Sequence, residues 1–158
     1  MGYTSRFLTL TKGTGVINRI FHGYGKFEGE MDGRKNGALI SMANGKAVAF
    51  AIFNLQARGE MFVTHNDPVY EGMIVGLAPK PGDMIINVMK GKQLTNMRTQ
   101  GTDENVVLTP VRQMSIAEQL SMLNTDEALE ITPKSLRLRK AILNPTERKK
   151  NEKSGTPL

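Results

Sequence analysis

The chain has 158 residues, enough for one ordinary domain, and it carries a net charge of +6. It contains no cysteine, which excludes disulfide bonds and thiolate metal sites and suits a reducing compartment. No apolar run approaches the roughly 20 residues of a membrane span, and the first residues lead into no secretory signal. We therefore expect a soluble, cytoplasmic protein that does not span a membrane.

The excess positive charge is confined to the C-terminal segment. Eight of the 21 cations and two of the 15 anions lie between Lys134 and Lys153, so the remainder of the chain is neutral. A basic tail on a neutral body indicates attraction to a polyanion, and nucleic acid is the commonest one in the cytoplasm. A solvated, frayed terminus is the alternative interpretation.

The N-terminal residues predict a short helix followed by a strand. Apolar residues of Tyr3–Lys12 recur at roughly helical spacing, and glycines follow them. The segment Val16–Tyr24 carries β-branched and aromatic residues on both faces, as in a strand that is buried on both sides and needs neighbours. The charged, glycine-rich Gly23–Gly37 predicts a loop or linker.

Residues 38–77 predict a strand, a helix and a group of short strands. Ala38–Met42 predicts a strand with Asn44-Gly45 as its turn, and the alanine-rich Lys46–Arg58 predicts a helix. The buried stripe of this helix should consist of Val48, Ile52, Phe53 and Leu55. A tightly turned β meander is indicated by the runs Glu60–Val63, Val69–Tyr70 and Met73–Leu77.

The C-terminal third predicts two helices and three strands. Strands are expected at Val106–Leu108, Leu129–Thr132 and Leu136–Ile142, the last with Leu136 and Leu138 inward and Arg137 and Arg139 outward. Ser115 and Glu118 fit a capping box at the start of a helix. Asn144-Pro145 would begin a short, highly charged helix or tail.

A long basic loop separates these two groups of elements. Residues 90–101 hold three cations and no anion, and they show no regular hydrophobic period. Its cations could bind RNA phosphates, and its amides could hydrogen-bond to sugars or base edges. The candidate RNA-binding residues of this loop are Lys90, Lys92, Gln93, Asn96 and Arg98. A solvated hairpin loop is the alternative interpretation.

No catalytic or metal site is visible in the sequence. Neither Gly45-Lys46 nor Gly91-Lys92 belongs to a phosphate-binding loop, because the flanking residues of that motif are missing. His22 and His65 have no partner at ligand spacing, so we interpret them as a strand residue and a turn residue. The adjacent carboxylates Asp103 and Glu104 would point apart, which disfavours acid/base chemistry.

Four motifs in order resemble the C-terminal part of the BipA/TypA family of translational GTPases. They are GKAVA (45–49), VYEGMIVG (69–76), GKQLTNMR with GTDE (91–98 and 101–104), and ITPKSLRLRK (131–140). The earlier runs FLT (7–9), TKGTG (11–15) and FHGY (21–24) resemble the last helix and strand of a ferredoxin-like domain, the fifth domain of elongation factor G. The resemblance covers nearly the whole chain.

The resemblance implies an α+β fold in three parts: a remnant of the ferredoxin-like domain at 1–36, a mainly β family-specific domain at 37–143, and a basic tail at 144–158. It implies ribosome binding, large-subunit assembly, and growth under stress or cold. The basic loop would contact large-subunit ribosomal RNA and the tRNA acceptor end, with Arg137, Arg139 and Lys140 as further RNA-binding residues. GTP and Mg²⁺ are implied for the full-length family, whose GTP-binding domain is absent from this sequence.

Two alternatives accompany this hypothesis. One is a GTP-hydrolysing translation factor of which this chain is the C-terminal part. The other concerns assembly: we expect a monomer, but an exposed sheet edge left by the partial ferredoxin-like domain would allow self-association.

Overall fold

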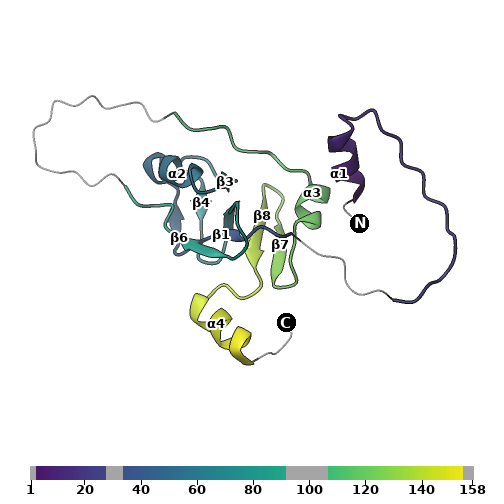
Figure 1. Ribbon diagram of the computed structural model, residues 1–158. Coiled ribbons are helices and arrows are strands. Elements are labelled where there is room, and N and C mark those ends of the chain that lie inside the picture. The colour runs from purple at the N-terminus through teal and green to yellow at the C-terminus, as the bar shows by residue number, and fades with distance from the viewer. Residues whose placement is uncertain (1–2, 28–33, 92–106, 155–158) are drawn as a thin grey trace, which may run out of the picture.

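The computed structural model describes residues 3–27, 34–91 and 107–154. Its architecture is α+β, which confirms the predicted fold class (Figure 1). The helices are α1 (Tyr3–Leu10), α2 (Ala49–Gln56), α3 (Ile116–Ser121) and α4 (Pro145–Ser154). The strands are β1 (Ala38–Ser41), β2 (Gly45–Lys46), β3 (Glu60–Met61), β4 (Pro68–Val69), β5 (Ile74–Leu77), β6 (Met84–Ile86), β7 (Glu127–Ile131) and β8 (Leu136–Lys140).

A four-stranded sheet with the order β3-β5-β1-β6 forms the centre of the fold. Every residue of β1 and β5 is buried, because side chains cover the sheet on both sides. Successive residues of β1 point to opposite faces: Leu39 joins the core beneath α2, whereas Ala38 and Ile40 join a second core that includes Leu138 of β8. The apolar run of β1 is continuous because both faces of this strand are buried.

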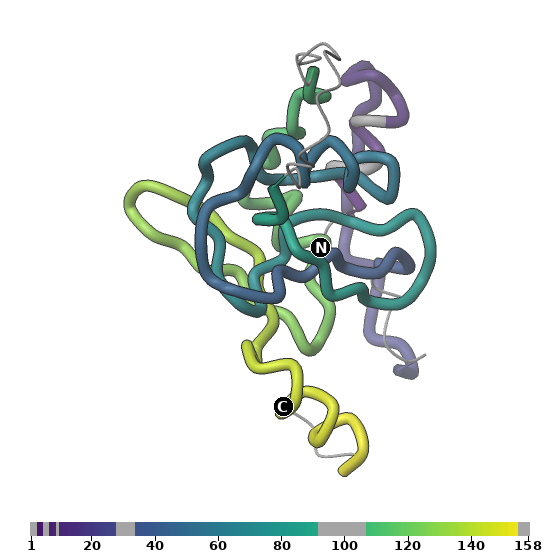
Figure 2. The backbone as a smooth tube through the Cα atoms, turned by 90° about the vertical axis from the view of Figure 1, so that its left-hand side faces the viewer, coloured from purple at the N-terminus to yellow at the C-terminus, as the bar shows by residue number. Residues whose placement is uncertain are grey.

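The strands β7 and β8 form a separate antiparallel hairpin that covers the second face of the sheet. Two contacts join it to the start of β5: an isolated bridge between Met73 and Arg139, and a 2.9 Å hydrogen bond from the Lys140 N–H to the Gly72 carbonyl. The hairpin is followed by α4, which extends away from the sheet and buries none of its residues (Figure 2).

Several predicted elements are confirmed. Helices begin and end close to the predicted residues at α1, α2, α3 and α4, and both hairpin strands lie where the pattern indicated. The α3 capping box is complete, since the Ser115 and Glu118 side chains each bind the other residue's backbone N–H. At α4, the Asn144 side-chain oxygen accepts hydrogen bonds from the backbone N–H groups of Thr146 and Glu147.

The predicted strand at Val16–Tyr24 is wrong. The segment forms no ladder with any described strand, and its apolar side chains are exposed, Ile20 to 91% and Tyr24 to 99%. A strand needs a neighbouring strand to pair its backbone, and the described residues offer none here. The sheet edge on which the self-association hypothesis depends is therefore not formed, while the oligomeric state and the three-part domain division stay predictions.

The predicted meander and the strand at Val106–Leu108 are also wrong. The strand β4 pairs with β2 rather than with β3 or β5, and β6, which was not predicted, lies parallel to β1. Val107 is 80% exposed and unpaired, and Val106 lies outside the described residues. Within α2, Ile52 and Leu55 are buried as predicted, but Phe53 lies about 100° around the helix from Ile52 and is half exposed.

Candidate nucleic-acid interface

The β7–β8 hairpin presents two chemically different faces. Its register pairs Glu130 with Arg137 and Ala128 with Arg139, so these four residues share one face. The other face carries the pairs Leu129–Leu138 and Ile131–Leu136. The predicted inward position of Leu138 is confirmed, since it is buried in the second core, whereas Leu136 is only partly buried.

The polar face of the hairpin is held by hydrogen bonds. The Tyr70 hydroxyl donates to Glu130 over 2.6 Å, and Arg137 lies 3.5 Å from the same carboxylate. Burial, followed by the bond to Glu130, raises the pKa of Tyr70 to about 12, so the phenol stays protonated at neutral pH. Arg139 donates to the backbone carbonyls of Lys140 and Ala141. Arg137 and Arg139 remain partly exposed, as an RNA contact requires.

Lys140 requires a correction to the predicted RNA-binding set. Only 2% of its side chain is exposed, and its Nζ lies 2.5 Å from Asp83, 2.6 Å from Asp126 and 3.1 Å from Glu127. The buried Glu127 carboxylate also receives two hydrogen bonds from Arg34, at 2.7 and 3.2 Å. Lys140 alternates with Arg139 along β8 and therefore points to the opposite face, into the protein. In this structure its ammonium group pairs with carboxylates inside the protein and is not exposed for a contact with RNA.

This buried charge cluster makes stability depend on pH. Burial alone would raise the pKa of Asp83, but hydrogen bonds from the Ala38 N–H and from Lys140 hold it below its usual value. A carboxyl group whose pKa is lower in the folded than in the unfolded state stabilises the folded protein at pH values above the unfolded pKa, about 3.9 for aspartate. This stabilisation is lost as the pH falls through the folded pKa.

We therefore expect Asp83→Asn to lower stability at pH 7 and to flatten the loss of stability as the pH falls below about 4. Urea unfolding of both proteins at several pH values measures this. The exposed α4 substitution Glu152→Gln is the control and should leave the profile unchanged. Parallel profiles for Asp83→Asn and the unmodified protein would contradict the assignment.

Both ends of the predicted basic loop are anchored to the body of the protein. At the first end, Val88 is buried and its carbonyl accepts a 2.9 Å hydrogen bond from the Val48 N–H, two residues before the exposed Lys90. At the other end, the Gln56 side chain of α2 exchanges two hydrogen bonds with the backbone of Thr109. The predicted contacts Lys92, Gln93, Asn96 and Arg98 lie outside the described residues.

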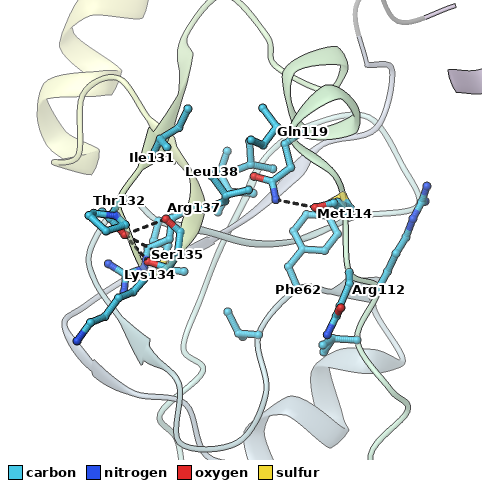
Figure 3. Close-up of a pocket in the computed structure, with 18 residues that line it drawn as sticks. Phe62, Arg112, Met114, Gln119, Ile131, Thr132, Lys134, Ser135, Arg137 and Leu138 are labelled. Atoms are coloured by element: carbon cyan, nitrogen blue, oxygen red, sulfur yellow. Dashed lines mark hydrogen bonds between the residues drawn. The ribbon is translucent and has the colours of Figure 1, made fainter. Parts of the chain in front are cut away.

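A groove of about 720 Å³ opens between the turn of the hairpin and the segment that leads into α3 (Figure 3). Its apolar part includes Phe62, Met114, Ile131 and Leu138, and its cations are Arg112, Lys134 and Arg137. The patterns used in the sequence analysis did not indicate this groove, because its residues come from four separate stretches of chain. The stretch ITPKSLRLRK contributes one wall.

The described residues contain no group of three or more His, Asp or Glu side chains arranged to hold a metal ion. His65 is a turn residue whose Nδ1 accepts a 3.2 Å hydrogen bond from the Ala49 N–H, at the start of α2. His22 lies in the unpaired segment and not in a strand. In the part of the chain that is described, no helix is long and apolar enough to cross a membrane.

Comparison with known proteins identifies the family. The model of the TypA/BipA C-terminal domain matches residues 36–145, which is more than half of the chain. The chain belongs to the BipA C-terminal domain family. The resemblance seen in the sequence motifs is thereby confirmed, and the motifs of residues 45–49, 69–76 and 131–140 lie within the matched region.

Individual relatives agree with this assignment. A protein of Buchnera aphidicola subsp. Schizaphis graminum is 46% identical over 159 residues, an alignment that covers 100% of this chain and 26% of that protein. A protein of Salmonella typhimurium is 45% identical over 151 residues, covering 95% of this chain and 25% of the relative. Both are named large ribosomal subunit assembly factor BipA. The chain thus spans about a quarter of the length of these relatives.

Proposed function

We propose that this chain is the ribosome-binding C-terminal module of a BipA-type translational GTPase that acts in large ribosomal subunit assembly in the cytoplasm. Support comes first from the similarity to assembly factors across the whole chain. Growth under stress or cold is the setting that the family resemblance implies for this role. GTP hydrolysis would need a phosphate-binding loop, and the sequence contains none, so we assign no catalytic step to this chain.

The observation that carries the RNA contact is the basic loop with two anchored ends. Lys90 is exposed at its start, and the hydrogen bonds of Val88 and Thr109 attach both flanks to α2 or to the residue before it. The anchored flanks fix where the segment leaves and rejoins the body of the protein, and its cations are of the kind that binds phosphates. We propose that it contacts large-subunit ribosomal RNA and the tRNA acceptor end, and that Arg137 and Arg139 add further contacts.

The loop hypothesis predicts the behaviour of Lys92→Ala/Arg98→Ala. Losing two phosphate contacts should weaken binding to purified large ribosomal subunits about tenfold and reduce the salt dependence of the affinity. Sedimentation binding across a salt series measures both effects. Stability should change by less than about 0.5 kcal/mol, the usual range for substitutions of charged residues in a predicted surface loop.

A matched control comes from α4. Lys149→Ala/Lys150→Ala removes the same charge from the exposed C-terminal helix. If only this second variant loses affinity, the binding residues lie in the tail and not in the loop. An affinity of the unmodified protein that does not change with salt would contradict an electrostatic contact with RNA altogether.

A further inference from the structure

The groove beside the hairpin has a lining of one charge sign. Arg112, Lys134 and Arg137 contribute to it, and no carboxylate does. Of these, Arg112 and Arg137 lie near Glu118 and Glu130 outside the lining, whereas Lys134 forms no ion pair within the described residues. The volume of the groove, about 720 Å³, falls in the range of roughly 300–1,000 Å³ that is typical of sites for small ligands. The groove therefore suits an anionic ligand with an apolar part.

Gln119 supplies an acceptor that has no partner. The residue is 7% exposed, its Nε2 donates to the Met114 carbonyl, and its Oε1 has no hydrogen-bond partner within the described part of the chain. A flipped amide would bring two carbonyl oxygens together, so the bond to Met114 holds Oε1 as the free acceptor. Figure 3 shows this oxygen directed toward the hairpin side of the groove. An acceptor of this kind can take a hydrogen bond from an N–H group of a ligand.

Hydrogen bonds close the turn of the hairpin that carries Lys134. Thr132 Oγ1 accepts a hydrogen bond from the Ser135 N–H over 3.0 Å, and the Thr132 N–H donates to the Ser135 carbonyl over 2.9 Å. These bonds close the turn around Pro133 and Lys134 (Figure 3). Lys134 lines the groove from this turn, its exposed side chain extends outward from the hairpin in Figure 3, and the apolar side chains Phe62 and Leu138 lie within the groove.

We propose that this groove binds one unstacked nucleotide of single-stranded RNA. The base would lie against Phe62 and Met114, its amino group would donate to Gln119 Oε1, and its phosphate would bind Lys134 or Arg112. An aromatic surface, a base-edge hydrogen bond and a nearby cation are the components by which proteins recognise single-stranded RNA. The inference rests on the proposed function, because it identifies a second contact with the same class of partner.

An acidic peptide fits the same groove less well. Its carboxylates would satisfy the cations and a backbone N–H could donate to Gln119 Oε1, but an acidic peptide lacks the flat ring with an edge donor that a base would place against Phe62. The amino groups of adenine and cytosine, in contrast, offer an N–H within a flat, largely apolar ring. We therefore expect short oligomers of adenylate or cytidylate to bind more tightly than those of uridylate, because uracil has no amino group and its N3–H lies between two carbonyl oxygens that would face Gln119 Oε1.

Fluorescence anisotropy with labelled hexa-adenylate, hexacytidylate and hexauridylate tests the proposal on the full chain. Gln119→Leu keeps the volume and removes the acceptor, so it should weaken binding of the first two oligomers about three- to tenfold and abolish the preference over hexauridylate. Lys149→Ala, on the exposed α4, is the matched control and should keep the preference. An unchanged preference in Gln119→Leu would overturn the proposal.

A second measurement needs no substitution. In ¹⁵N-correlated NMR spectra of the unmodified protein, added hexa-adenylate should shift the side-chain amide signals of Gln119. Shifts confined to residues 90–101 and α4 would overturn the groove assignment while leaving the proposed function intact. Hexamer binding in the groove without any binding to large ribosomal subunits would instead contradict the proposed function alone. Displacement of hexa-adenylate by an alternating Glu-Leu peptide that itself shifts Gln119 would assign the groove to a protein partner.

Discussion

Replacing Lys140 by methionine should lower the free energy of unfolding by about 3 kcal/mol, because it removes the cation from a buried cluster of carboxylates. The Glu127 side chain is fully buried and would keep Arg34 and the Asn124 N–H as partners, whereas Asp83 and Asp126 are 36% and 45% exposed and would be partly rehydrated. The expected loss in the free energy of unfolding is therefore at the lower end of the range for removing one partner of a buried ion pair. Urea unfolding at pH 7 measures it.

The control for this prediction is Lys149→Met on α4, where the side chain is exposed and the same substitution should change stability by less than about 0.5 kcal/mol. A loss below about 1 kcal/mol for Lys140→Met would mean that the ion pairs do not hold the hairpin. Such a result would also reopen the assignment of Lys140 to packing rather than to RNA binding.

Gly72→Ala should cost a similar amount, about 3 kcal/mol, for a different reason. Gly72 has φ +82°, a left-handed conformation, and a Cβ at this position would lie 2.7 Å from the Cα of Leu143. Its N–H donates to the Ser41 carbonyl and its own carbonyl accepts from Lys140, so moving this backbone would disturb β1 and β8 together. Thermal unfolding followed by circular dichroism measures the loss.

The chain offers a matched glycine for this experiment. Gly82 has φ +98°, but a Cβ there would meet nothing within 4 Å. Gly82→Ala should therefore cost only the conformational part, about 1 kcal/mol. Equal losses at the two positions would show that the close approach of Leu143 does not matter, and that the hairpin and sheet tolerate separation there.

Lys140 and Gly72 matter for function because their contacts join the hairpin to the sheet. The hairpin carries Arg137, Arg139 and one wall of the groove, while the sheet and α2 hold the ends of the basic loop. Losing the contacts of Lys140 or Gly72 would change how these surfaces lie relative to each other. Reduced ribosome binding in either variant would then be a consequence of positioning rather than of a lost RNA contact.

Local sequence signals predicted the helices and the hairpin because these elements depend on nearby residues. The α3 capping box, the Asn144-Pro145 start of α4 and the alternation along β8 each act over a few positions. The long-range pairings gave no comparable signal. The strand β6 has two exposed residues out of three, Met84 and Ile85, so its parallel pairing with β1 left no clear alternation to detect.

The sequence likewise predicted some features of the candidate site and not others. Its cations were visible as residue types, and the basic loop as a composition without regular period. Which cations face outward was not visible: Arg139 and Lys140 are neighbours in a basic run, yet one is partly exposed and the other is buried among three carboxylates. Gln119 was not predicted either, because an unpaired acceptor becomes apparent only when all its neighbours are placed.

The sequence by itself determined the α+β class, the family and the location of the excess charge, since these follow from local pattern, motif order and composition. The tertiary structure decided the order of the strands, the burial of Lys140 and the existence of the groove. Each of these depends on contacts between residues far apart in the chain, such as Arg34 with Glu127 or Met73 with Arg139. Such contacts leave no periodic signal, because they form only when the chain folds back on itself.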